Sequence, residues 1–575
     1  MIRRIFSYMG PYKKYGWLAG LCVAAEVAFE LIIPTLMADL VDVGVATGDR
    51  GYIFRQGAWM AVCAVLALVL GAGSARFSAL CGQGLGAQLR QAEFAKLQDF
   101  SFANVDRFQA SSLITRLTND VTTIQNSVST GLRPAIRGPV MMVCALAFSF
   151  SINAQLALVF LVAAPTLGLL LFSIVRRVGP MFGRMQQAID QVNRVIQENL
   201  TAVRVVKAYV RGRHEVEKFD TVNQNWRSTS ERAFRLTALN MPAMQLVMYV
   251  TILCILWFGG RLVQTAGLQV GELTGFLSYV LQVLNSLMMI SNVFMMLTRA
   301  LTSGQRIMEV MDETPTISQG DAQDITVKAG DIRFEHVSFQ YKPDAEHPVL
   351  SDVSFHILPG QTVGIIGQTG SAKSTLVQLI PRLYDATGGQ IYIDGRPIQQ
   401  YPLRHLRDAI AMVLQKNTLF SGTVRDNLRW GKEDATDAEI DEVCRIACVD
   451  EFIDRLEDGY DTDLGQGGVN VSGGQKQRLC IARALLKRPK VLILDDSTSA
   501  VDTATEAKIR QGLAQSLPGM TKIIIAQRIS SVRHADQIFL LQDGKLEAAG
   551  THESLLASSP IYQEICASQK EGVEL

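Results

Sequence analysis

The chain carries almost no net charge. Its 575 residues include 55 lysines and arginines and 54 aspartates and glutamates, so the formal net charge is +1 at pH 7. A protein that binds nucleic acid through broad electrostatic attraction needs a clear positive excess. The near balance argues against such a protein, and we expect no nucleic-acid partner.

The sequence also lacks the ligand spacing of a zinc site. Its nine cysteines are scattered, and none stands at zinc-ligand intervals from histidines. Cys444 and Cys448 are four residues apart, on one face of an expected helix, and we interpret them as packing residues. The N-terminus has no small-residue cleavage site of a signal peptide. These features favour a reducing cytosol around the soluble part of the chain.

Long apolar runs are abundant, but only in residues 15–300, whereas residues 320–575 resemble a soluble α/β protein. A membrane-spanning helix needs about 20 mostly apolar residues. Six stretches meet this requirement, at 16–43, 53–75, 133–152, 155–175, 241–262 and 272–298. The sequence therefore predicts an α-helical membrane domain of six spans.

The connections between the spans predict the orientation of the protein. The links between spans two and three and between spans four and five are long, helical and basic, whereas the other links are short and carry few basic residues. By the positive-inside rule, the N-terminus, both long loops and everything after residue 300 are cytoplasmic. We expect a multi-pass protein of the cell membrane, in contact with lipids, with a membrane domain at 1–315, a linker at 316–330 and a soluble domain at 331–575.

Polar residues inside the predicted spans need an explanation, because a charge at mid-bilayer costs several kcal/mol. Glu26 and Glu30 are four residues apart and share a helix face. Either a neighbour such as Arg76 neutralises them, or they face water near the inner leaflet, or they line a cavity that favours cationic or amphipathic cargo. Asn285 and Asn292 in the last span line a cavity or join helices. The candidates for a substrate cavity are therefore Glu26, Glu30, Asn285 and Asn292.

A phosphate-binding pattern follows the first strands of the soluble part. The apolar strand TVGIIG leads into GQTGSAKST and an amphipathic helix, an arrangement in which loop amides and a helix N-terminus hold phosphate. Ala372 replaces the usual glycine, but Lys373 and the magnesium-binding hydroxyl of Ser374 remain. About 120 residues downstream, the strand VLILD ends in Asp495 and Asp496. The pattern predicts binding of ATP with Mg²⁺.

A second phosphate-type element stands at VSGGQKQRLCIARALL. Ser472, Gly473 and Gly474 form a turn that opens a helix with its positive dipole end exposed. An isolated SGG is most often a helix N-cap. Its place between the Gly-rich loop and the acid-ended strand makes the element specific.

Together these motifs resemble the ATP-binding-cassette (ABC) transporters, and in particular an exporter half with six spans followed by one α/β P-loop nucleotide-binding domain. The motifs that carry the resemblance are Walker A at 367–374, the signature VSGGQ at 471–475, Walker B at Val491–Asp495, the Q-loop around Gln415, the D-loop SAVD at 499–502 and the aromatic A-loop residue Tyr341. The resemblance covers essentially the whole chain.

The resemblance implies a role for each motif. Tyr341 stacks on adenine, Lys373 and the loop amides hold the β- and γ-phosphates, and Mg²⁺ lies among Ser374, Asp495 and Gln415. The ATP-binding residues would be Tyr341, Gly367, Gln368, Thr369, Gly370, Ser371, Ala372, Lys373, Ser374, Thr375 and Gln415.

In this family Walker A of one half faces the signature of another half. The residues presented to a partner would be Ser472, Gly473, Gly474 and Gln475 of the signature and Asp502 of the D-loop. The long loops around 101–108 and 208–214 would be coupling helices that rest on the nucleotide-binding domains.

Two catalytic positions depart from the family pattern. Active members have glutamate after the Walker B aspartate to polarise the attacking water, whereas this chain has Asp496, one methylene shorter. A misplacement of about 1 Å costs on the order of a hundredfold in rate. The switch histidine is replaced by Gln527, which can bond the γ-phosphate but cannot change its charge. Together with Ala372, three residues that would surround the same nucleotide differ from the family pattern, whereas the signature matches it.

This distribution predicts a degenerate ATP site in a heterodimeric, multidrug-type exporter. The chain would bind ATP tightly, hydrolyse it slowly, and complete the active site of a second, non-identical half, so that efficient hydrolysis needs that partner. The cargo would be amphipathic or hydrophobic, namely a drug, lipid or peptide. The alternatives are a homodimer in which Asp496 and Gln527 are neutral variation, an ATP-gated or regulatory membrane protein, and an importer with the exporter fold.

Overall fold

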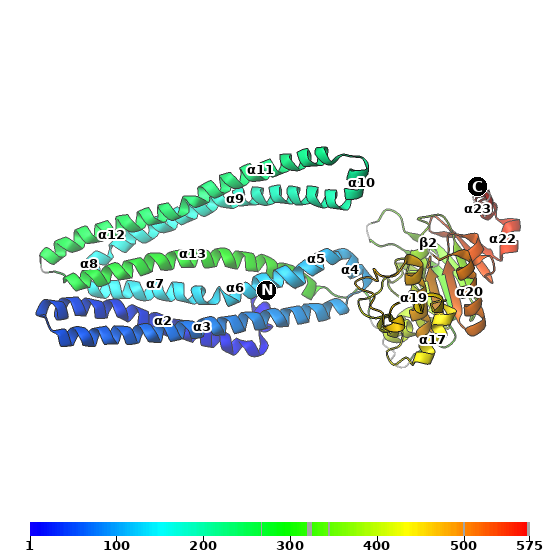
Figure 1. Ribbon diagram of the computed structural model, residues 1–575, viewed down its shortest axis with the longest axis horizontal. Coiled ribbons are helices and arrows are strands. Elements are labelled where there is room, and N and C mark those ends of the chain that lie inside the picture. The colour runs from blue at the N-terminus through cyan, green and yellow to red at the C-terminus, as the bar shows by residue number, and fades with distance from the viewer. Residues whose placement is uncertain (266, 319–324, 343–344, 498–500, 572–575) are drawn as a thin grey trace. The chain divides into compact units, whose positions relative to one another are not determined.

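The computed structural model describes residues 1–265, 267–318, 325–342, 345–497 and 501–571. It divides into two compact units. The first contains Met1–Gln98 and Ala110–Glu313, and the second contains Asp99–Gln109 and Thr314–Leu575 (Figure 1). A short segment between two long stretches of the first unit therefore belongs to the second.

The first unit is built from helices. They are α1 (Ile2–Ser7), η1 (Gly10–Tyr12), α2 (Lys13–Asp39), η2 (Leu40–Val45), α3 (Arg50–Gln98), α5 (Ala110–Thr115), η3 (Arg116–Asp120), α6 (Val121–Ser129), α7 (Leu132–Ile152), α8 (Ala154–Ala157), α9 (Val159–Thr201), α10 (Val203–Ala208), α11 (Gly212–Ala238), α12 (Asn240–Gln264) and α13 (Val270–Asp312). With 49 residues, α3 is more than twice as long as the roughly 20 residues that cross a bilayer. It therefore continues well beyond the membrane, and α9 and α13 with 43 residues each do the same.

Among the residues that the structure describes, five helical stretches are long and apolar enough to cross a membrane, as the predicted membrane domain requires. They are Gly10–Val45, Arg50–Gln98, Ala110–Ile152, Gly212–Gln264 and Val270–Asp312. They contain the first, second, third, fifth and sixth predicted spans. A further apolar helical stretch, Ala154–Leu170, lies on α8 and the start of the 43-residue helix α9 and covers most of the predicted fourth span, 155–175. The sixfold count therefore stays a prediction.

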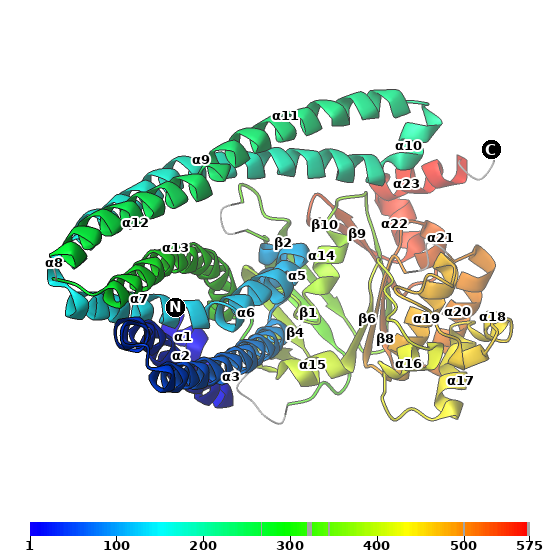
Figure 2. The same ribbon diagram turned by 60° about the vertical axis from the view of Figure 1, so that its left-hand side comes forward.

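Helices α9, α11 and α12 form a long arm. The first half of α9 runs beside α12 and its second half beside α11, and α10 caps the far end, as both ribbon views show (Figures 1 and 2). Of the remaining long helices, α2, α7 and α13 pack on one another around a buried apolar cluster that includes Val23, Leu31, Phe276 and Tyr279, and α3 packs along α2. The tip of this arm is α10 and the turn that follows it, and along the chain it lies about midway between α7 and α13.

A network of four charges joins α2 to α7. The guanidinium of Arg133 lies 2.6 Å from Oε1 of Glu26, and Arg137 pairs with both Glu26 and Glu30, the latter at 2.6 Å. The Glu26 side chain is only 5% exposed. Gly71 of α3 faces the network, and a Cβ there would lie 3.1 Å from the Arg133 guanidinium. This arrangement fits neutralisation by neighbours, but the neighbours are these two arginines of α7 rather than the suggested Arg76.

Glu26→Gln is expected to destabilise the membrane unit, because the half-buried guanidinium groups of Arg133 and Arg137 lose the buried carboxylate that they share. Removing one partner of a buried pair costs about 3–5 kcal/mol. The thermal unfolding midpoint of the detergent-solubilised protein should fall, and Glu26→Gln/Arg133→Gln should recover part of the loss. Glu30→Gln, at a side chain that is 33% exposed, is the milder control. An unchanged midpoint for Glu26→Gln would contradict a stabilising role for the network.

The second unit contains two sheets. An antiparallel sheet has the order β2-β1-β4-β5, and a six-stranded sheet has the order β10-β9-β3-β8-β7-β6, parallel except for β10. The strands are β1 (Ile332–Phe339), β2 (Leu350–Ile357), β3 (Thr362–Ile366), β4 (Gly388–Ile393), β5 (Arg396–Pro397), β6 (Ile410–Val413), β7 (Val491–Asp495), β8 (Thr521–Ile525), β9 (Gln537–Gln542) and β10 (Lys545–Gly550).

Helices cover these sheets. They are α4 (Phe102–Phe108), α14 (Lys373–Gln378), α15 (Leu403–Ala409), α16 (Val424–Arg429), α17 (Asp437–Ile446), α18 (Asp450–Ile453), α19 (Gly473–Leu486), α20 (Thr503–Ser516), α21 (Ile529–Val532), α22 (His552–Ser558) and α23 (Pro560–Glu571). All residues of β7 and β8 are buried, as expected for central parallel strands with both faces covered. The α/β fold predicted for the soluble part is therefore present.

The strand order decides where the motifs meet. β8 lies between β3 and β7, and all three are parallel. Parallel strands place their carboxyl ends at the same edge of a sheet, where ligands of open α/β sheets bind. The loop after β3, the acids at the end of β7 and the residues after β8 therefore come to one place.

Candidate ATP site

The Gly-rich loop connects β3 to α14 through two left-handed residues. Gly370 has φ +89° and Ala372, the N-cap of α14, has φ +70°. A side chain in this region clashes with the backbone, at a cost of roughly 1–2 kcal/mol. The conformation explains why the loop pattern calls for glycine before the lysine. Ala372 keeps the loop geometry but carries this strain.

Lys373 and Ser374 stand at the start of α14 and face the end of β7. The Lys373 ammonium donates to the carbonyl oxygens of Gly367 at 2.8 Å and Gln368 at 2.7 Å, so it lies folded over the loop. The Ser374 hydroxyl donates to Asp495 Oδ1 at 2.9 Å. Hydroxyl and carboxylate oxygens are the ligands that Mg²⁺ prefers, so the pair has the chemistry expected for an ATP-bound magnesium ion.

Asp496 and Gln527, the two residues that differ from the family pattern at catalytic positions, contact each other. Gln527, which follows β8, donates through Nε2 to Asp496 Oδ2 at 2.8 Å. Asp496 has a left-handed backbone, with φ +48°, which aspartate tolerates better than most residues. Sequence reading placed both residues at one site, and the structure joins them by a direct hydrogen bond.

The charged side chains of the site are partly buried, and this shifts their pKa values. Burial raises the pKa of Asp496, while the hydrogen bond from Gln527 and the charge of Lys373 oppose that rise. Burial likewise raises the pKa of Asp495 and lowers the pKa of Lys373. The side chain of Gln415 also hydrogen-bonds Asp496, so this predicted magnesium ligand lies beside the second acid. Opposite charges therefore face one another where a triphosphate and its metal would bind.

Tyr341 follows β1 and is 48% exposed, as an adenine-stacking ring requires. Its ring meets Phe339 edge-on, with centroids 4.9 Å apart, and Tyr384 edge-on at 5.2 Å. Its hydroxyl lies 3.0 Å from that of Thr375 in α14. The structure thus brings the predicted adenine platform to α14, the helix that follows the phosphate-binding loop.

Comparisons with known proteins agree with this geometry. The family model for the ABC transporter transmembrane region matches residues 17–287, and that for the ABC transporter matches residues 350–499. An ABC transporter ATP-binding protein of Bacillus subtilis, YfiB, is 41% identical over 576 residues, covering 100% of both chains. The chain belongs to the ABC transporter family. Its ATP-binding cassette is therefore an ATPase coupled to transport.

One further relative and one solved structure show which type of ABC transporter fold this chain has. The ATP-dependent lipid A-core flippase of Chromobacterium violaceum is 33% identical over 573 residues, 99% of this chain and 97% of that protein. A solved structure of a bacterial Atm1-family ABC exporter with ATP bound has a TM-score of 0.84 and 24% identity, and the match covers 97% of this chain and 99% of that one. The transporter therefore has the exporter-type fold.

One contact that sequence reading missed ties α4 to the cassette. The Tyr384 hydroxyl donates to Asp106 Oδ2 of α4 at 2.6 Å, and Phe102 packs on the same ring at 6.1 Å between centroids. Burial and the neighbouring carboxylate raise the pKa of Tyr384 above its usual range, so the hydroxyl stays a donor. Because Tyr384 also touches Tyr341, the first predicted coupling segment, 101–108, is connected to the adenine platform. Tyr384 belongs to none of the sequence motifs, so its position between α4 and Tyr341 is evident only from the structure.

The signature is presented at the surface of the cassette. Ser472 caps α19, with Gln475 N donating to Ser472 Oγ at 3.3 Å and Ser472 N donating to Gln475 Oε1 at 2.8 Å. Ser472 and Gly473 are exposed. Asp502 caps α20 through a 2.9 Å bond from Thr505 N, whereas Ser499 and Ala500 of the D-loop lie outside the described residues. An exposed, capped helix N-terminus suits contact with a phosphate held elsewhere.

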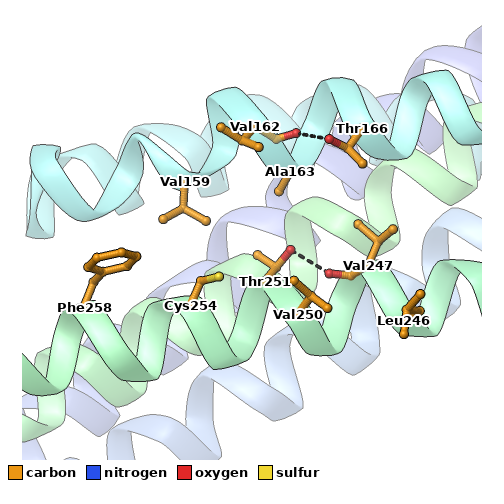
Figure 3. A pocket seen from close by; sticks show the side chains of 10 residues that line it. All are labelled: Val159, Val162, Ala163, Thr166, Leu246, Val247, Val250, Thr251, Cys254 and Phe258. Carbon is orange, nitrogen blue, oxygen red and sulfur yellow. Dashed lines mark hydrogen bonds between the residues drawn. The ribbon is translucent and has the colours of Figure 1, made fainter.

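The membrane unit holds apolar pockets. Asn285 and Asn292 line one of about 510 Å³ with Met288, Met296 and Pro134, so the two candidate amides share a cavity. Another, of about 340 Å³, lies between α9 and α12 (Figure 3).

The two threonines that line the pocket between α9 and α12 donate their hydroxyl hydrogens within their own helices. The Thr166 hydroxyl bonds the carbonyl of Val162, and the Thr251 hydroxyl bonds that of Val247, both at 2.7 Å within their own helices. The remaining lining is apolar, including Phe258. This pocket therefore suits a lipid chain or another apolar surface.

Ala372→Gly is expected to stabilise the cassette, because glycine adopts the left-handed conformation without strain. The relief of roughly 1–2 kcal/mol is partly offset by about 0.5–1 kcal/mol of backbone entropy. The unfolding midpoint of the nucleotide-free protein should therefore rise slightly. Gly370→Ala is the matched control. A Cβ there meets no atom within 4 Å, so only backbone strain acts, and the midpoint should fall.

Tyr384→Phe is expected to loosen α4 while the ring contacts remain. A hydrogen bond to a charged group contributes about 1.5–3 kcal/mol, so amide hydrogen exchange in residues 102–108 should accelerate by tenfold or more. Tyr401→Phe is the control, because Tyr401 donates to Ile393 O at 2.8 Å within the cassette core. Unchanged exchange in Tyr384→Phe would show that this bond does not hold α4.

Proposed function

We propose that this ABC transporter is one subunit of an ATP-driven exporter in which its own ATP site is catalytically weak. A second, non-identical half would supply the efficient site, which the signature of this chain completes. The observation that carries the proposal is the hydrogen bond between Asp496 and Gln527, because both substituted positions act on the same nucleotide.

The chemistry of this pair supports slow hydrolysis. A general base must reach the attacking water and accept its proton. Asp496 is one methylene shorter than the glutamate of active relatives, and its Oδ2 accepts the Gln527 amide. An amide does not titrate near neutral pH, so Gln527 cannot take up charge as a histidine does. The pair can hold and orient nearby groups, but it is poorly suited to activating water.

Binding of ATP is supported independently of hydrolysis. The loop with Lys373, the Ser374–Asp495 pair and the platform at Tyr341 offer donors, metal ligands and an aromatic face. Bound Mg²⁺ would neutralise phosphate charge there. ATP held by this half would keep the two halves together, and hydrolysis at the partner's site, completed by Ser472 and its neighbours, would reset the transporter.

The cargo is proposed to be amphipathic, with a lipid the best supported member of the drug, lipid and peptide classes. The pocket of Asn285 and Asn292 combines amides with soft methionine side chains, and the pocket between α9 and α12 is apolar. The 33% identical relative is a lipid A-core flippase by name. Six spans in the cell membrane, with the cassette in the cytoplasm, complete the proposal.

Asp496→Glu/Gln527→His is expected to restore catalysis at this chain's site. The longer carboxylate recovers about 1 Å of reach, and the imidazole can change its charge, so turnover at this site should rise by about one to two orders of magnitude. The measurement is vanadate trapping of labelled nucleotide on each half of the co-purified pair.

Asp496→Asn is the control and should leave the already slow site unchanged within about twofold. Each single restoring change should give less than the pair. The proposal fails if the unaltered site already traps nucleotide as fast as the partner's site, or if the chain assembled only with itself hydrolyses ATP briskly.

A further inference from the structure

A groove opens beside the N-terminal helices of the membrane unit. Its volume is about 660 Å³, within the roughly 300–1,000 Å³ of small-molecule sites. One wall comes from α1, from Met9 that follows it and from the start of α2, while Cys81 of α3 and two residues at the start of α7, Leu132 and Ile136, form the rest. The groove shares no lining residue with the pocket of Asn285 and Asn292 or with the one between α9 and α12.

Two glycines of α2 shape the groove. Gly16 and Gly20 are four residues apart and therefore lie on one face of the helix. A Cβ at Gly16 would lie 3.4 Å from Cys81 Sγ of α3, and a Cβ at Gly20 would lie 3.3 Å from Ile136 Cδ1 of α7. The bare backbone at these positions lets α3 and α7 come close to α2 on the face that lines the groove.

The rim of the groove is apolar and exposed. Trp17 and Leu21 of α2 are 83% and 70% exposed, and Phe6 of α1 is 43% exposed. All three side chains line the groove. Exposed apolar side chains that gather around one groove indicate a surface that binds something apolar.

Polarity along α2 changes in the order of the parts of a phospholipid. Lys13 is the first α2 residue of the lining, and Leu21 lies eight residues later, about 12 Å further along the helix axis. Trp17 stands between them, and tryptophan gathers at the boundary between headgroups and acyl chains. The predicted first span begins at residue 16. A cation therefore stands at headgroup level, and apolar side chains follow at the level of the acyl chains.

The walls of the groove belong to the same end of the predicted spans. Lys13 precedes the span 16–43, Cys81 follows the span 53–75, and Leu132 precedes the span 133–152. Because successive spans cross in opposite directions, the start of the first, the end of the second and the start of the third share one side of the membrane. The positive-inside rule predicts that this side is cytoplasmic.

The charge around the groove has one sign. Residues 1–25 contain no aspartate or glutamate and four basic residues, namely Arg3, Arg4, Lys13 and Lys14. Arg4 pairs with Asp312 at 2.5 Å, whereas Lys13 is exposed and forms no ion pair with the described residues. The next acid along the chain, Glu26, is paired with Arg133. Basic pockets between membrane helices on the cytoplasmic side bind anionic headgroups, so an occupant gains by bringing a phosphate to Lys13.

We infer that this groove binds an anionic glycerophospholipid of the adjacent leaflet as a resident ligand, with its phosphate at Lys13 and an acyl chain along Trp17, Leu21 and Ile136. The lipid would connect α1 and α2 to α7 at the membrane surface. It is not the proposed cargo, because the groove is separate from the pocket of Asn285 and Asn292. The inference rests on the predicted orientation of the spans and not on the weak ATP site.

The test measures lipid binding to the full-length protein in detergent by native mass spectrometry. The protein is titrated with phosphatidylglycerol or with phosphatidylcholine that has the same acyl chains. The first phosphatidylglycerol should bind about fivefold more tightly than the first phosphatidylcholine, the effect of one cation close to an anionic lipid. Lys13→Gln should remove most of this preference and leave the affinity for phosphatidylcholine unchanged.

Matched variants separate the groove from the basic N-terminus as a whole. Lys14→Gln makes the same change in charge one residue away, at a side chain that does not line the groove and lies over the Tyr15 ring, and it should keep the preference. Lys13→Arg should also keep it. Trp17→Ala should weaken both lipids by a similar factor, because it removes apolar contact and no charge. Trp59→Ala, at an exposed tryptophan of α3 outside the groove, should weaken neither.

Three results would overturn the inference. The first is equal affinity of the unaltered protein for the two lipids. The second is an equal loss of preference in Lys13→Gln and Lys14→Gln, which would indicate general attraction to the N-terminus. The third is a loss of the first bound lipid in Asn285→Ala, which would place that lipid in the cargo pocket. None of these measurements involves ATP turnover, so the inference can fail while the proposed weak ATP site stands, and the reverse also holds.

Discussion

The parallel alignment of β3, β8 and β7 is the constraint on which the ATP site depends. Since parallel strands place their carboxyl ends at one edge, the Gly-rich loop, the acids after β7 and Gln527 after β8 converge, although more than 100 residues separate β3 from β7. β8 lies in the middle, so Gln527 reaches Asp496 directly. A change after either strand therefore alters the same edge of the sheet.

The fold keeps the signature independent of the residues that follow β7 and β8. The acids and Gln527 belong to the sheet edge, whereas the signature begins α19 and is held by its own capping bonds. The two elements are stabilised locally and separately, so weakening one leaves the other intact.

In the membrane unit, the charged side chains of α2 are paired with charges on another helix. Glu26 and Glu30 are matched by two arginines from another helix, so these acids brace α2 against α7. In the function proposed above, the polar groups that meet the substrate would instead be uncharged amides such as Asn285 and Asn292, which lie beside apolar side chains. Uncharged polar groups in apolar surroundings fit an amphipathic cargo better than a strongly cationic one.

Local sequence determined much of this protein. Apolar runs predicted the membrane helices, because a span requires about 20 apolar residues wherever it lies. The family motifs located the P-loop, Walker B strand and signature, since each depends on neighbours in the chain. The same reading placed Asp496 and Gln527 at one nucleotide through the resemblance to ABC transporters.

Tertiary structure alone decided which distant side chains meet. It paired Glu26 with Arg133 and Arg137 rather than with Arg76, joined Gln527 to Asp496, and placed Tyr384 between α4 and Tyr341. The reason is physical: such contacts depend on helix packing and strand order, which bring together residues whose separation along the chain carries no periodic signal.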